Sequence, residues 1–195
     1  MAEAARTVLM YLVFPLWVLA GLLDWICHRR TAIERTSGLK ENLLHLLMTA
    51  EVGIGMLAVA LLEIDAAVLL IVLAVFVLHE LTVYWDLHYT TPLRPVRPFE
   101  QMVHSFLELL PLLSLALLAT VRWDQALALA GLGPQPADFS LRLKAQPLPP
   151  AYLLGGLLAA VVLNALPLLE ETWRCWNARG ALPASARIRP SPGPR

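Results

Sequence analysis

Charged residues are scarce in this sequence. Asp, Glu, Lys and Arg make up only 15% of its 195 residues, whereas 58% are hydrophobic. A typical soluble domain has about 25% charged residues, so this composition argues against one and favours a polytopic membrane protein. Acidic and basic residues balance at 15 each. No excess of positive charge is available to neutralise phosphates, and we therefore expect no nucleic-acid partner.

Cysteine is almost absent as well. The only two are Cys27 and Cys175, and neither belongs to a CxxC motif. A disulfide framework and a thiolate metal cluster are therefore not expected. Histidine is also rare, but its five copies lie near acidic residues at the ends of apolar segments.

Five long apolar segments are the main feature that is present. They cover about residues 8–27, 43–62, 66–85, 99–121 and 151–169. About twenty helical residues at 1.5 Å each cross the apolar core of a bilayer. We expect an all-α bundle of five transmembrane helices, forming one integral membrane domain over residues 1–176. Residues 177–195 are rich in Pro, Ser, Ala and Arg, and we expect a disordered cytoplasmic tail there.

The first apolar segment has an alternative interpretation. Arg6 precedes it, and Val18-Leu19-Ala20 loosely resembles the cleavage site of a secretory signal peptide. However, the apolar run continues beyond Ala20 and ends at Arg29 and Arg30, which favours a helix that stays in the membrane.

The distribution of Lys and Arg predicts the orientation of the bundle. Five spans place 4 of these residues on the side of the N-terminus (Arg6, Arg122, Arg142, Lys144) and 11 on the other (Arg29, Arg30, Arg35, Lys40, Arg94, Arg97, Arg174, Arg179, Arg187, Arg189, Arg195). Cytoplasmic loops carry the excess of Lys and Arg. We therefore expect the N-terminus outside and the C-terminus inside, in a bacterial inner membrane with the lipid bilayer as partner.

Histidine and carboxylate residues pair on four of these helices, all at the predicted cytoplasmic end. Residues four or seven apart lie on nearly the same helix face. The pairs are Asp24 with His28, Glu41 with His45, His79 with Asp86, and Glu100 with His104. Ionisable groups at membrane depth are costly and usually functional. We predict that these eight residues form a metal site.

A short internal similarity supports a paired arrangement. The segment LKENLLHLL matches PFEQMVHSF at an offset of 59 residues, so that Glu41 and His45 correspond to Glu100 and His104. This predicts a core of two similar helical hairpins with the fifth helix added. Repeats of this type often place a binding site at their interface.

The donor set suggests the chemistry. Imidazole and carboxylate without thiolate suit Fe, Mn or Zn, as one or two divalent ions. The spacing Glu-x-x-x-His differs from the Glu-x-x-His of carboxylate-bridged di-metal bundles, so only the general arrangement is similar. Glu51 and Glu108, one to two turns deeper, are candidate catalytic bases. We predict a metal-dependent oxidoreductase or hydrolase that acts on a lipid-like or other small-molecule substrate.

Three alternatives remain open from the sequence. The same ligands could bind an ion transiently in an ion or metal transporter, or two histidines could bind haem in a b-type haem protein. The third alternative is a non-catalytic polar network, in which arginines neutralise the acids. Arg29, Arg30, Arg94 and Arg97 lie close enough in sequence for this role.

Overall fold

The computed structural model describes residues 2–179 and shows five helical spans that are long and apolar enough to cross a membrane. Three are single helices: α3 (Leu39–Leu61), α4 (Ala66–Thr90) and α5 (Pro98–Val121). The first and last spans are composite. The first joins α1 (Ala2–Val8), η1 (Leu9–Val13) and α2 (Phe14–Thr31), and the last joins α7 (Pro150–Ala160), η3 (Val161–Ala165) and α8 (Leu166–Ala178).

All five predicted spans are therefore present, but most are longer than expected. α4 continues to Thr90 and α8 to Ala178, the latter two residues into the predicted tail. Hydropathy marks only the apolar part of a helix, whereas these helices continue through polar residues that are buried inside the bundle. Residues 180–195, which hold the rest of the predicted tail, lie outside the described part of the chain.

Both composite spans contain a π-helical turn just before a proline. η1 ends two residues before Pro15, and η3 ends two residues before Pro167. A proline has no amide N–H, and its ring collides with the carbonyl of the residue four positions earlier. The wider π turn provides room for the ring, and the span continues without a break.

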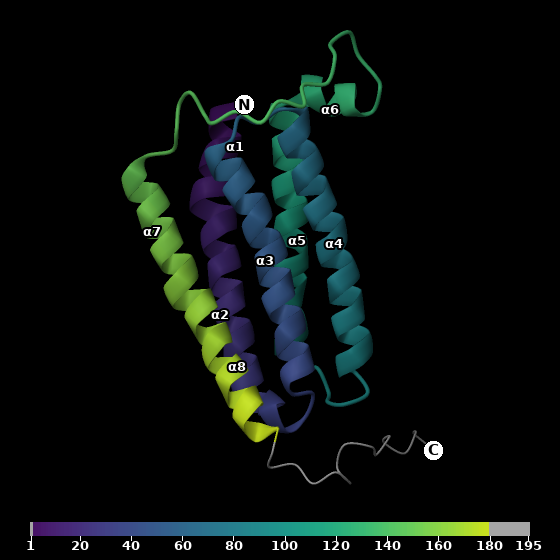
Figure 1. Ribbon diagram of the computed structural model, residues 1–195, viewed down its shortest axis with the longest axis vertical. Coiled ribbons are helices and arrows are strands. Elements are labelled where there is room, and N and C mark those ends of the chain that lie inside the picture. Colours follow the sequence, from purple (N-terminus) through teal and green to yellow (C-terminus); the bar gives the residue numbers. More distant parts are fainter. Residues whose placement is uncertain (1, 180–195) are drawn as a thin grey trace.

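The two ends of the bundle are formed by different segments of the chain. The N-terminal residues, the α3–α4 turn and α6 (Trp123–Leu129) gather at one end, named here the α6 end (Figure 1). The opposite end, named the α8 end, holds the α2–α3 connection with η2 (Ile33–Arg35), the α4–α5 connection and the last turn of α8. The ion site proposed from sequence falls at the α8 end.

The longest connection, residues 122–149, contains both a short helix and a bridge to another turn, although it is rich in Gly and Pro. It includes α6 and then pairs with the α3–α4 turn through a bridge between Leu62 and Leu143. Around this bridge the amide of Glu63 donates to the Arg142 carbonyl at 2.9 Å, and the amide of Lys144 donates to the Leu61 carbonyl at 2.9 Å. Residues 138–144 thus form a strap that holds α3 and α4 together at the α6 end.

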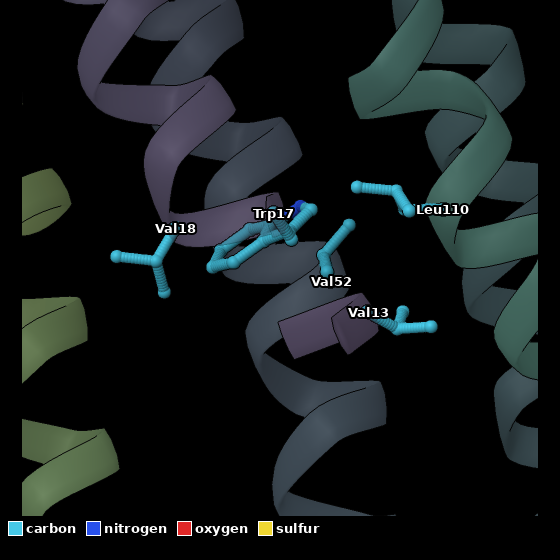
Figure 2. Packing of buried hydrophobic residues seen from close by; sticks show 5 residues of the cluster. All are labelled: Val13, Trp17, Val18, Val52 and Leu110. Atoms are coloured by element: carbon cyan, nitrogen blue, oxygen red, sulfur yellow. The ribbon is translucent and has the colours of Figure 1, made fainter. Parts of the chain in front are cut away.

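The apolar core lies in the middle of the bundle and towards the α6 end. Figure 2 shows its central cluster, Val13, Trp17, Val18, Val52 and Leu110, contributed by η1, α2, α3 and α5. Many large apolar side chains instead face outwards, including Leu57, Leu81 and Leu109. Such an extensive exposed apolar surface matches the hydrocarbon environment of a bilayer.

Candidate metal centre

Ionisable side chains fill the interior of the bundle at the α8 end. Asp24 and His28 come from α2, Glu41 and His45 from α3, Asp86 from α4, Glu100 and His104 from α5, and Glu171 from α8. Most are buried, and His28, Glu41 and Glu171 have no exposed surface. Burying so many charges is favourable only when each finds a partner or a metal ion.

Local sequence features position these ligands. The Pro-rich segment between α4 and α5 stops one helix and starts the next, because Pro98 occupies the first helical position, where a missing amide is harmless. The Arg97 amide then donates to Glu100 Oε2 at 3.4 Å. Glu100 and His104, four residues apart, consequently face the bundle interior together.

One group of four side chains can hold a metal ion. Asp24, His28, Glu100 and His104 each offer a ligand atom, and these atoms lie within 4.8 Å of one another. His104 Nε2 is 2.9 Å from Asp24 Oδ1, and His28 Nε2 is 3.5 Å from the same oxygen. Two atoms bound to one ion at about 2.1 Å each are separated by roughly 3–4 Å, which these spacings approach.

Glu171 sets the orientation of His28. Its Oε2 lies 3.1 Å from His28 Nδ1, and its Oε1 accepts a hydrogen bond from Asn42 Nδ2 at 2.9 Å. With the proton on Nδ1 directed to Glu171, Nε2 carries the lone pair and faces Asp24 and Glu100. That Nε2 atom is buried and has no hydrogen-bond partner among residues 2–179. A carboxylate behind a ligating histidine is a typical outer-shell arrangement at metal sites.

A second group, His28, Glu41 and His45, also places ligand atoms within 4.8 Å of one another. It shares His28 with the first group, and the His28 and His45 rings stack with centroids 4.5 Å apart. His45 Nε2 also approaches Asp86 Oδ2 at 3.4 Å. The two groups therefore form one continuous cluster.

Arg94, from the α4–α5 connection, is an internal cation of this cluster. Its Nη2 donates to Glu41 at 2.5 Å and to Glu100 at 2.6 Å, and its Nε donates to both oxygens of Glu41. Burial lowers the pKa of the guanidinium, but the hydrogen bonds and charges of Glu41 and Glu100 outweigh burial and raise that pKa above its usual value. Arg94 consequently remains charged and compensates both acids.

The structure places His79 apart from both ligand groups. Its Nδ1 lies 3.8 Å from Glu51 Oε2, and Glu51 also accepts a hydrogen bond from the Thr82 hydroxyl at 2.9 Å. Neither ring nitrogen of His79 has a hydrogen-bond partner in the described residues. His79 and Glu51 thus form a separate buried pair, deeper in the bundle than the four-residue group.

A small cavity borders both this pair and the four-residue group, and it is named here the polar cavity because eight of its sixteen lining residues are polar or charged. It has a volume of about 80 Å³ and is lined by Asp24, His45, His79, Asp86, His104 and Glu108, among others. Two or three water molecules of about 30 Å³ each fill such a volume. Of the two predicted catalytic bases, Glu108 borders this cavity directly, and Glu51 reaches it through His79.

The structure places seven of the eight residues that were predicted as ligands in this buried cluster, with His79 as the exception, whereas sequence reasoning gave no role to Glu171 or Asn42. A signal was present for Glu171: it is one of two consecutive acids at the end of an apolar span. Its neighbour Glu170 faces outwards and binds Arg29 at 2.5 Å and Arg174 at 2.9 Å.

No protein-family model, curated protein or solved structure significantly matches the chain.

Proposed function

We propose that this chain is a membrane metalloenzyme that binds a divalent ion, Fe, Mn or Zn, through Asp24, His28, Glu100 and His104. The observation that supports this proposal is the convergence of four ligand atoms within 4.8 Å, together with a buried His28 Nε2 that makes no hydrogen bond in the described part of the chain. Two imidazoles and two carboxylates suit these metals. The reaction is an oxidation or hydrolysis of a lipid-like substrate at the cytoplasmic side of the membrane.

One ion fits these residues better than two. Both ligand groups need His28, and its Nδ1 is already directed to Glu171. Arg94 contacts both Glu41 and Glu100, but Glu41, the carboxylate of the second group, accepts hydrogen bonds from both Nε and Nη2 and is the more fully engaged of the two acids. The cavity of about 80 Å³ is also too small for a haem macrocycle, which favours a bare ion over the haem alternative.

The protein groups around the ion have distinct roles in this proposal. The bound metal would supply Lewis acidity or an activated water. Glu171 and Asn42 hold His28 in orientation, and Arg94 offsets the charge of Glu100. Glu108 borders the same cavity as Asp24 and His104, where it can accept a proton from a water or substrate hydroxyl. His79 can pass a proton on to Glu51.

Metal analysis of the protein purified in lipid nanodiscs tests the proposal. We expect about one Fe, Mn or Zn per wild-type chain, because one four-ligand site is complete. His104→Ala removes a ligand and should abolish most of the bound metal. His88→Ala is the matched control, since His88 is an exposed histidine near the same end of the bundle and should leave metal content unchanged.

A second candidate function is a non-catalytic polar network, favoured by the way Arg94 neutralises Glu41 and Glu100. The same experiment separates the two. Metal-free protein after expression with all three metals supplied would support the network and overturn the metalloenzyme. Metal that persists unchanged in His104→Ala would place the ion elsewhere and also contradict the proposed site.

A further inference from the structure

A second, larger cavity lies on the α6 side of the ligand cluster. Its volume is about 370 Å³, within the usual range for small-molecule pockets. Six helical elements border it: η1, α2, α3, α4, α5 and α7. Its lining is almost entirely apolar, with Ser114 and the hydroxyl-bearing Tyr152 as exceptions. A hydrocarbon ligand matches this lining, and a charged one does not.

Small residues create part of this space. Gly53 and Gly55 of α3 and Gly156 of α7 all lie in the cavity wall. A Cβ atom placed on Gly53 would meet nothing within 4 Å, and one on Gly55 would reach Val75 only at 3.6 Å. A Cβ atom on Gly156 would already meet the Phe14 ring at 3.3 Å, so Gly53 is the position of the three with the most room for a larger side chain.

The apolar and polar cavities adjoin. Trp17 and Val52 line both of them, and Figure 2 shows the Trp17 ring beside Val52 between α2 and α3. These two side chains therefore separate the two cavities, and a ligand that extends from one cavity into the other must pass between them or displace them. Beyond them lie Asp24 and His104, two of the four proposed metal ligands.

We propose that the two cavities together bind a single-chain amphiphile: an unbranched aliphatic chain in the apolar cavity, with a small uncharged hydroxyl or carbonyl head in the polar cavity. This inference rests on the proposed function and names its substrate class. A methylene group has about the volume of a water molecule, about 30 Å³. The apolar cavity therefore accepts a chain of roughly a dozen carbon atoms, and the polar cavity accepts a head of roughly two or three non-hydrogen atoms.

The properties of the polar cavity define the head group. Its volume of about 80 Å³ excludes the glycerophosphate head of a bilayer phospholipid. Asp24, Asp86 and Glu108 in its wall disfavour an anionic head. Hydroxyl and carbonyl groups are small, and both can hydrogen-bond to the histidines or bind a metal through oxygen.

Photolabelling tests this inference. The probe is a long-chain fatty alcohol with a diazirine in mid-chain, added to wild-type protein in phosphatidylcholine nanodiscs and mapped by peptide mass spectrometry. We expect labels on cavity-lining peptides of α3, α5 and α7, and competition by unlabelled fatty alcohol despite the excess of phosphatidylcholine. Gly53→Leu should reduce this labelling several-fold, because its side chain fills the cavity.

Gly155→Leu is the matched control. A Cβ atom on Gly155 also meets nothing within 4 Å, but this residue lies outside the cavity wall, so labelling should be retained. Labelling confined to outward-facing residues, or equal in Gly53→Leu and wild type, would overturn the inference. Metal content is measured on the same samples. Specific cavity labelling of a metal-free protein would sustain the amphiphile site while refuting the metalloenzyme.

Discussion

At the scale of single residues, His28 is the central group of the site. It is fully buried, stacks on His45, contacts Glu171 through Nδ1 and faces Asp24 and Glu100 through Nε2. If the imidazole of His28 could rotate freely, its Nε2 atom would no longer be held facing Asp24 and Glu100. We therefore expect the affinity of the proposed site for metal to depend on residues that do not touch the ion.

Glu171→Gln tests this dependence. The amide keeps the size of the side chain but weakens the hydrogen bond to His28 Nδ1, and we expect metal affinity to fall about 10–100-fold. Competitive titration with a metal-binding dye measures it. Glu170→Gln is the control, because within residues 2–179 Glu170 pairs with Arg29, Trp25 and Arg174 and with none of the histidines. An unchanged affinity in Glu171→Gln would show that Glu171 does not orient the ligand.

Arg94 is the second residue whose replacement has a defined outcome. Arg94→Met leaves Glu41 and Glu100 buried without their cation, and we expect a loss of about 3–5 kcal/mol in stability. Thermal unfolding of the metal-free protein in detergent measures this loss. Arg30→Met removes an exposed arginine nearby and should change the midpoint little. Equal midpoints for the two variants would contradict the internal role of Arg94.

The sequence predicts which side chains share a helix face, but not their depth relative to other helices. His79 and Asp86 are seven residues apart and lie on one face, yet two helical turns separate them by about 10 Å along the axis. A single ion cannot span that distance. His79 therefore meets Glu51, and Asp86 meets His45. The positions of Arg94 and Glu171 likewise depend on chain connections that spacing does not specify.

At the scale of elements, the five spans were predictable because about twenty apolar residues permit few alternatives. The short helix α6 was not, since WDQALAL lies in a segment dominated by Gly and Pro, and its stability comes from contacts with α4 and α5. The π turns could not be predicted from the sequence either. Pro15 suggests a local adjustment of the helix, but not whether that adjustment is a kink or a wider turn.

The close approach of the first and last spans depends on Gly21. A Cβ atom there would lie 1.8 Å from Asn164 Oδ1, and the Asn164 amide donates to the Val18 carbonyl at 3.2 Å. Gly21→Ala forces Asn164 away from that carbonyl. We expect a loss of about 1–3 kcal/mol, seen as a lower unfolding midpoint in detergent.

Gly155→Ala provides the comparison for this prediction. Gly155 belongs to the same last span as Asn164, and a Cβ atom there meets nothing within 4 Å. Its substitution should leave the midpoint unchanged or raise it slightly, because alanine is the better helix former. If both variants unfolded at the same temperature, the contact between Gly21 and Asn164 would not hold the two spans together.

At the scale of the whole molecule, the excess of Lys and Arg at the α8 end predicts that this end faces the cytoplasm. Reporter fusions in a bacterial host check this orientation. Green fluorescent protein fused after residue 195 should fluoresce, and alkaline phosphatase at the same point should be inactive. The same reporters inserted after residue 134, at the α6 end, should behave in the opposite way. Reversed results would place the proposed metal site on the outer side of the membrane.

The strap at the α6 end has a practical consequence. Its backbone hydrogen bonds fix residues 138–144 against the α3–α4 turn, whereas residues 131–136 between α6 and the strap are all exposed. Exposed loop tips tolerate insertions best. An epitope placed within 131–136 would therefore be displayed at the α6 end, opposite the proposed metal ligands, where an antibody fragment could enlarge this small protein for imaging.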